Sequence, residues 1–143
     1  MSKQQRIGRA GEYLAASYLA RIFDEVLTTS ESSRFDFFCT SDNRNIKVQV
    51  KCTDTSFDHH GSQRVRWDIK KKVSGTKSYR TYAPEEVDLF AFVCLINDKV
   101  FFAANRNLGK TFQKKLDYID TVDSMQSLKL ALEVLEVNAK PLQ

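Results

Sequence analysis

The chain of 143 residues is 42% hydrophobic and 28% charged, and its formal net charge is +4. A chain of this length and composition is expected to fold as one globular domain, residues 1–143, which buries its core without disulfides or metal ions. No stretch approaches the roughly 20 apolar residues of a membrane-spanning helix, and the first residues do not resemble a signal sequence, so we expect an intracellular, cytoplasmic protein.

A helix is expected over residues 5–23, where apolar side chains recur at steps of three and four. These side chains are Ile7, Gly11, Leu14, Tyr18 and Ile22. Glu12 lies at the edge of this stripe. Its carboxylate can therefore reach along the buried side of the helix without entering the core.

Two strands are expected to follow, over residues 35–40 and 46–52, joined by the turn-forming residues 41–45. The second strand alternates strictly between apolar and polar residues. Its apolar residues are Ile46, Val48, Val50 and Cys52. Because side chains alternate along a strand, this segment should have one buried face and one polar face.

Asp36 of the first strand falls on the same face as the polar residues of the second. These polar residues are Lys47, Gln49 and Lys51. A two-residue turn at 42–43 sets Asp36 opposite Gln49, and a turn at 43–44 sets it opposite Lys51. In either register Asp36 lies about 5 to 8 Å from both side chains, because opposite and diagonal neighbours span that range. The sequence therefore predicts that a carboxylate, an amide and an ammonium group converge.

The remaining pattern predicts further strands and a closing helix. Residues 53–63 are typical of a loop, and residues 64–69 of a strand with a basic outer face. The nearly continuous apolar run at 87–96 predicts a central strand buried on both faces, followed by a strand at 100–104. A final helix begins at Asp123. The order of helix, strands and helix predicts a mixed α/β fold.

The polar face of the hairpin has the groups of a magnesium site. Asp36 and Gln49 offer the oxygen ligands that Mg²⁺ prefers, and the backbone carbonyl of Val50 and waters can complete the shell. Lys51 could orient a metal-bound water, assist its deprotonation or stabilise a charged transition state. The alternative is a solvated strand face with an Asp–Lys ion pair.

Three short motifs resemble the PD-(D/E)XK nuclease superfamily. They are Gly8 to Ala16 in the helix, Phe35-Asp36-Phe37 in the first strand, and Val48 to Cys52 in the second. Residues 86–93, which follow Tyr82, look like the next core strand of that family. The resemblance implies a restriction-endonuclease-like fold, in which helices flank a mixed central sheet. Phe35 stands where the family expects proline, and Gln49 stands where most members have an acid.

A glutamine at this position also occurs in the small PD-(D/E)XK homing endonucleases encoded in group I introns, which the chain resembles most. The resemblance implies Mg²⁺-dependent hydrolysis of phosphodiester bonds in double-stranded DNA through a metal-bound water, with Mn²⁺ as a substitute ion. Glu12 and Asp36 would be metal-associated, Gln49 would position metal or water, and Lys51 would serve the nucleophile. The implied metal ligands are Glu12, Asp36, Gln49 and the carbonyl of Val50.

The basic residues are concentrated between residues 63 and 80, where seven bases face one acid. Such a segment suits a polyanion, because lysine and arginine that neutralise phosphates release counterions. We therefore expect the DNA-binding residues to be Arg64, Arg66, Lys70, Lys71, Lys72, Lys77 and Arg80. The alternative is a solvated basic loop. Tyr79 and Tyr82 are further candidates, either as DNA contacts or as core residues.

Three other functions remain open at this stage. Holliday-junction resolvases share the Gly-Glu helix and the hairpin lysine, and Gln49 would suit a DNA-binding module that has lost catalysis. An interaction domain with an incidental Asp–Lys pair is the third. Because one active site cuts one strand, a double-strand break implies a homo-oligomer, a dimer or a tetramer.

The histidines and cysteines are expected to lie outside the site. His59 and His60 fall in a Gly-Ser loop, where exposed histidines are common. The three cysteines lack the close pair spacings of zinc sites and lie in apolar strand runs, so we expect reduced core residues.

Overall fold

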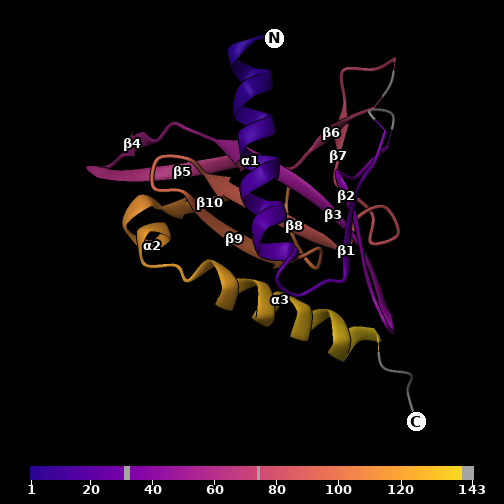
Figure 1. The fold of residues 1–143 in the computed structure, drawn as a ribbon. Coiled ribbons are helices and arrows are strands. Elements are labelled where there is room, and N and C mark those ends of the chain that lie inside the picture. Colours follow the sequence, from indigo (N-terminus) through magenta and orange to yellow (C-terminus); the bar gives the residue numbers. More distant parts are fainter. Residues whose placement is uncertain (31–32, 74, 140–143) are drawn as a thin grey trace.

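The computed structural model describes residues 1–30, 33–73 and 75–139, and its centre is a five-stranded mixed sheet (Figure 1). The strand order is β1-β2-β3-β8-β9; β3 and β8 are parallel, and the other neighbours are antiparallel. The strands are β1 Glu25–Thr28, β2 Phe37–Ser41, β3 Arg44–Thr53, β8 Leu89–Cys94 and β9 Lys99–Ala104. The expected mixed α/β class with a central sheet is confirmed.

A second, smaller sheet arises largely from the connection between β3 and β8. Its antiparallel strands, in the order β10-β5-β4, are β4 Phe57–His59, β5 Ser62–Asp68 and β10 Thr111–Lys115. The connection also contains a hairpin of β6 Lys71–Lys72 and β7 Tyr79–Arg80. Parallel strands require a long crossover, and here the crossover provides a separate layer of structure.

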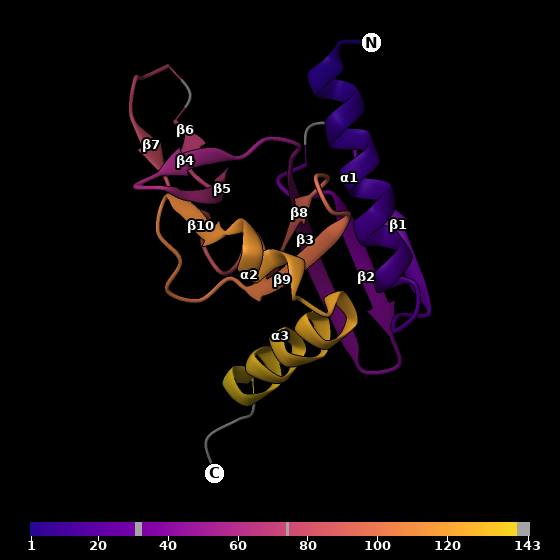
Figure 2. The same ribbon diagram turned by 90° about the vertical axis from the view of Figure 1, so that its left-hand side faces the viewer.

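The helices are α1 Lys3–Leu19, α2 Leu116–Asp120 and α3 Ser124–Ala139. Helices α1 and α3 pack on one face of the central sheet, and α2 packs with the small sheet on the other face. Figure 2 shows α1 on one side of β3 and β8, and the β10-β5-β4 sheet on the other. Both views show the start of α1 and the β6–β7 hairpin projecting at the same end of the molecule. None of the helices among the described residues is long and apolar enough to cross a membrane.

Two apolar cores follow from these layers. On one face, Ala15 of α1 and Leu128 of α3 pack with Val48 and Val50 of β3. On the other face, Trp67 of β5 packs with residues of β8. All six residues of β8 are buried, as expected for a central strand covered on both faces.

The β2–β3 hairpin has the first of the two expected registers. Ser41 pairs with Arg44 and Phe37 with Val48, so the turn is at 42–43. Ile46, Val48 and Val50 are buried, and the intervening polar residues are partly exposed, which confirms the predicted alternation. The strict alternation therefore identified the two faces of β3 correctly.

The first helix differs from its expected bounds and stripe. It begins after Ser2, which forms a capping box with Gln5, and it ends at Leu19 rather than near residue 23. Its buried residues are Gly11, Ala15 and Leu19, whereas Ile7, Leu14, Tyr18 and Ile22 are only partly buried. Two of the three buried residues, Gly11 and Ala15, are small, which lets α1 pack closely against β3.

Six short elements were not expected from the sequence. They are β1, β4, β6, β7, β10 and α2. The strands β1 and β4 have three or four residues each with little burial, so they show no clear alternation. Strand β10 pairs with β5 across a long separation in sequence, which local pattern cannot reveal.

Gly11 allows the close approach of α1 to β3. A Cβ atom at this position would lie 2.6 Å from both Cβ and Sγ of Cys52. Real Cβ atoms essentially never approach another atom so closely, so a larger residue must displace the helix or the strand. The glycine thus sets the distance between Glu12, the next residue, and the end of β3.

Replacing Gly11 with alanine is therefore expected to destabilise the protein. The overlap with Cys52 should lower the free energy of unfolding by about 1 to 3 kcal/mol. Gly8→Ala is the matched control, because a Cβ there meets no atom within 4 Å. That variant should gain about 0.5 to 1 kcal/mol from helix propensity. Urea unfolding of both variants measures the difference, and equal effects would contradict the close packing.

Candidate active site

The candidate site lies where β3 extends beyond the start of β2. Strand β2 begins at Phe37, which pairs with Val48, but β3 continues to Thr53. The next backbone amide of β3 that faces this side belongs to Val50, and Asp36 Oδ2 accepts a hydrogen bond from it at 2.8 Å. A carboxylate therefore replaces the missing backbone partner, which meets the requirement that buried amides be paired.

The main chain at Asp36 is held by hydrogen bonds on both sides. Its amide donates to the carbonyl of Val48 at 2.8 Å, and its carbonyl accepts from the amide of Thr29 at 3.2 Å. Thr29 Oγ1 also donates to the carbonyl of Phe35 at 2.5 Å. These contacts orient the Asp36 carboxylate at the end of the strand pair.

Glu12 reaches the same place from α1, and its carboxyl group shares a hydrogen bond with that of Asp36. Burial, the neighbouring negative charge and this hydrogen bond together raise the pKa of Glu12 to about 6. Burial also raises the pKa of Asp36, which the Val50 amide, Glu12 and Lys51 partly offset. The two neighbouring carboxyl groups therefore readily share one proton, and Glu12 is the group that donates it to Asp36.

Gln49 and Lys51 complete the group from β3. Gln49 Nε2 donates to the carbonyl of Val50 at 3.4 Å. The positive charge of Lys51 favours the ionised form of Asp36, and Lys51 Nζ lies 5.3 Å from the centre of the Tyr82 ring. The structure therefore brings together Glu12, Asp36 and Lys51, three of the four residues that the sequence put forward as catalytic, and the fourth, Gln49, contacts the carbonyl of Val50.

Tyr82 is held against Lys51 by a buried amide that the sequence did not reveal. The ring packs edge-on against Phe90 with centroids 5.5 Å apart. Asn105 is 7% exposed, and its Nδ2 donates to the carbonyls of Tyr82, Ala83 and Val87 at 3.2, 3.2 and 2.9 Å. One side chain thus fixes the segment before β8, and with it the aromatic ring beside the lysine.

Arg80 is committed to an ion pair in the same segment. Its guanidinium donates to both oxygens of Glu86, at 2.6 and 3.2 Å, and Arg34 donates to Glu86 at 2.8 Å. The hydrogen bond from Arg80 is the main reason that the pKa of Glu86 falls to about 2. Arg80 therefore stabilises the loop around Tyr82, and its bidentate contact leaves fewer donors for DNA than we expected from the sequence.

The other predicted DNA-binding residues lie on the second sheet and the hairpin. Arg66 and Lys77 are exposed, whereas Arg64 is half-buried. Lys70 Nζ lies 4.8 Å from the ring centre of the exposed Tyr79. The side chains of Lys71 and Lys72 lie outside the described part of the structure.

The donor set suits a hard divalent cation. Among the described residues no cluster of three or more His, Cys, Asp or Glu side chains is present, so the site has two carboxylates rather than three acids. Mg²⁺ is commonly bound by one or two carboxylates with waters and substrate phosphates. The carboxylates of Glu12 and Asp36, the amide oxygen of Gln49 and the carbonyl of Val50 fit that chemistry.

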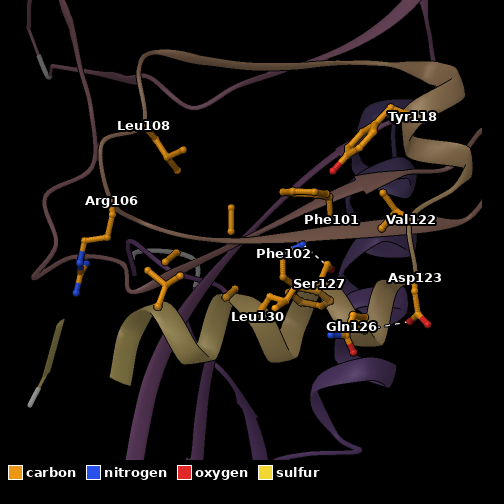
Figure 3. Close-up of a pocket in the computed structure, with 14 residues that line it drawn as sticks. Phe101, Phe102, Arg106, Leu108, Tyr118, Val122, Asp123, Gln126, Ser127 and Leu130 are labelled. Atoms are coloured by element: carbon orange, nitrogen blue, oxygen red, sulfur yellow. Dashed lines mark hydrogen bonds between the residues drawn. The ribbon is translucent and has the colours of Figure 1, made fainter. Parts of the chain in front are cut away.

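Another concave region, away from the candidate site, is an apolar groove. It has a volume of about 490 Å³ and runs between β9 and α3, lined mainly by apolar side chains such as Phe101 and Leu130 (Figure 3). Its charged lining residues, Arg106 and Asp123, lie at opposite ends of the groove. Asp123 accepts a hydrogen bond from the backbone amide of Gln126 at 3.0 Å. Among the residues that line the groove, Asp123 is the single carboxylate.

The histidines and cysteines do not join the candidate site. His59 and His60 are exposed at the β4–β5 turn, where their rings are 4.4 Å apart. All three cysteines are free, and burial raises the pKa of the Cys39 thiol to about 12. The expectation of reduced cysteines is confirmed, although Cys52 is only partly buried.

No protein-family model matches the chain, and no curated protein matches its sequence. A search of solved structures finds a bacterial homing endonuclease, I-Ssp6803I, with a TM-score of 0.69 and 12% sequence identity. The match covers 98% of this chain and 100% of that one. The two chains therefore share a fold over nearly their whole length, which agrees with the expected central sheet and flanking helices.

The crowding of the two carboxyl groups predicts a pH-dependent effect of Glu12→Gln in the metal-free protein. The raised pKa of Glu12 means that its contribution to stability is present below about pH 4.5 and is lost as the pH rises through about 6. A glutamine keeps a permanent hydrogen-bond donor toward Asp36 without the second charge. Its free energy of unfolding should exceed that of the parent at pH 8 by about 1 kcal/mol, after allowance for solvent screening of a half-buried group.

Urea unfolding in EDTA at pH 5 and pH 8 checks this expectation. The gain should be much smaller at pH 5, where Glu12 already holds a proton. Glu25→Gln is the control, because Glu25 is an exposed residue of β1. A gain that is equal at the two pH values, or a gain in the control as well, would contradict the shared proton.

Proposed function

We propose that this protein is a Mg²⁺-dependent endonuclease of the PD-(D/E)XK type, which hydrolyses phosphodiester bonds of double-stranded DNA in a homing or restriction role. The observation that carries the proposal is the convergence of Glu12 and Asp36 with Lys51 at the open end of β3. The shared fold with a bacterial homing endonuclease supports the same class. The shared fold alone would not be enough to assign this function, because one fold hosts many functions.

In this proposal Mg²⁺ is held by Glu12, Asp36, Gln49 and the carbonyl of Val50, and Mn²⁺ can replace it. The ion supplies charge neutralisation for the phosphate and lowers the pKa of a bound water. The residues present the carboxylates from two different elements, α1 and the start of β2. Because Gln49 is neutral, the site has less negative charge than one with a third acid, which predicts weaker ion binding.

Lys51 acts on the nucleophile or on the charged phosphate. Its ammonium group lies beside Asp36 and over the Tyr82 ring, so it is directed toward the same end of β3 as the carboxylates. There it can orient the attacking water, take part in its deprotonation, or stabilise the extra negative charge of the transition state. An arginine at this position keeps the charge but does not deprotonate, which separates these roles.

We further propose that the protein acts as a homo-oligomer, a dimer or a tetramer, on duplex DNA. One site of this kind cleaves one strand at a time. A two-fold dimer places two sites against the two antiparallel strands of a duplex, in keeping with the symmetry of DNA. Sedimentation of the protein with and without a duplex tests this part independently of cleavage.

Plasmid cleavage tests the hydrolytic function directly. The parent should nick or linearise supercoiled plasmid with Mg²⁺ and not in EDTA. Asp36→Ala and Lys51→Ala should each reduce the rate by about 100-fold or more, since each removes a group that acts on the transition state. Lys51→Arg should keep part of the rate if the charge is what matters, and should be inactive if Lys51 must give up a proton.

The control variant is Asp24→Ala, which removes an exposed acid outside the candidate site. Its rate should equal that of the parent. Equal rates for all variants would overturn the assignment, whereas salt-dependent DNA binding without any nicking would indicate an inactive binding module. Faster cleavage of four-way junctions than of linear duplex would indicate a resolvase.

DNA binding without Mg²⁺ should depend on salt through the lysines Lys70 and Lys77 rather than through Arg80. Lys70→Ala and Lys77→Ala should each reduce the slope of log K against log salt by about 0.9, the value for one phosphate contact. Arg80→Ala should mainly lower stability, because it breaks the ion pair with Glu86. Titration of a duplex at several salt concentrations measures the slopes, and a large loss of slope in Arg80→Ala alone would contradict this division.

A further inference from the structure

The outer face of the β10-β5-β4 sheet carries a compact set of polar side chains. We define the Arg66 face as Arg64, Arg66, Asp68, Thr111, Gln113 and Lys115. In the β5–β10 pairing, Arg64 lies opposite Lys115, Arg66 opposite Gln113, and Asp68 opposite Thr111. Directly opposed residues of an antiparallel pair point to the same side, so all six side chains share one face.

The alternate residues of the same strands fix which face this is. Val65 and Trp67 of β5 are buried, and the ring of Phe112 in β10 stacks on Phe92 with centroids 4.2 Å apart. These side chains point toward the central sheet. The Arg66 face must therefore point away from it.

This face is continuous with the candidate active site. A cavity of about 290 Å³ is lined by Lys51, Cys52 and Thr53 of β3 together with Arg66, Trp67 and Asp68 of β5. The catalytic lysine and the exposed arginine thus border the same space. A molecule seated on the Arg66 face would extend directly to the end of β3.

Two neighbours on the face lie beside the side chain of Arg66. Its guanidinium carbon lies 5.6 Å from the ring centre of Phe57 on β4, and its Nε lies 4.0 Å from Asp68 Oδ1. Arg66 itself is exposed. An arginine that is oriented on one side by an aromatic ring and a carboxylate can present its planar donors in one direction.

We propose that the Arg66 face enters the major groove of the DNA substrate, where Arg66 reads a guanine and Gln113 reads an adenine. The inference rests on the proposed function, in which duplex DNA is the substrate. Arginine forms bidentate hydrogen bonds with O6 and N7 of guanine, and glutamine forms them with N6 and N7 of adenine. Strand spacing of about 4.8 Å sets the outer strands of the sheet about 10 Å apart, comparable with a groove about 12 Å wide.

The composition of the face favours bases over phosphates at its centre. Gln113 carries no charge, so counterion release cannot account for it, whereas its amide offers one donor and one acceptor side by side. The positive charges of Arg64 and Lys115 lie together at one end of the face, where they suit the sugar-phosphate backbone. Because directly opposed side chains lie about 5 Å apart, Arg66 and Gln113 should contact neighbouring base pairs.

The test is a selection of duplexes from a pool with a randomised central segment, using the full-length protein in EDTA so that no cleavage occurs. The parent should enrich a motif with a guanine and an adenine in adjacent base pairs. Arg66→Lys should keep overall affinity but lose about 10- to 100-fold of the discrimination at the guanine, because lysine keeps the charge without the planar pair of donors. Gln113→Ala should lose the preference at the adenine alone.

Lys129→Ala is the control, because Lys129 is an exposed base of α3 on the opposite layer of the molecule. It should leave the selected motif unchanged. Absence of any enriched motif in the parent, or an unchanged motif in Arg66→Lys and Gln113→Ala, would overturn the assignment, and a uniform loss across all sequences would show a phosphate contact instead. Binding does not require Mg²⁺ here, so a protein that selects the motif but cuts no plasmid would disprove the nuclease and leave this inference standing.

Discussion

The unpaired edge of β3 is the constraint on which the site depends. Strand β2 begins at Phe37 while β3 continues to Thr53, so the amide of Val50 has no backbone partner on that side. The carboxylate of Asp36 satisfies it, at the cost of burying a negative charge beside Glu12. A partly buried carboxyl pair with a raised pKa is costly in a purely structural role, and it becomes useful when a cation shares the space.

Several distant parts of the chain serve to keep this edge in order. Gly11 brings α1 close to Cys52, which places Glu12 within hydrogen-bonding reach of Asp36. On the far side, Asn105 holds the segment of Tyr82, whose ring lies over Lys51. Glu12, Asp36 and Lys51 are thus positioned by packing and by buried hydrogen bonds of regular elements, which gives a more rigid arrangement than loops would.

The sequence predicted the parts of the site that depend on strand periodicity. The alternation of β3 identified the face of Gln49 and Lys51, and one of the two allowed registers is the observed one. The helix position of Glu12 indicated that contact was feasible, but the approach of α1 depends on the Gly11–Cys52 contact, which only the packed structure reveals. Asn105 follows β9 as the first of three polar residues, and nothing in the local pattern distinguishes it from a solvated turn. Gln113 and Lys115 were missed because β10 pairs with a strand far away in sequence.

The parallel pairing of β3 with β8 has a further consequence for how such a protein can evolve. The crossover that this pairing demands contains β4, β5 and the β6–β7 hairpin, whereas Glu12, Asp36 and Lys51 all precede it. Mutations at the exposed positions of this crossover leave Glu12, Asp36, Lys51 and the contact between α1 and β3 intact. Surface substitutions can therefore alter the outer face of the small sheet while the carboxyl pair and the lysine at the end of β3 stay unchanged.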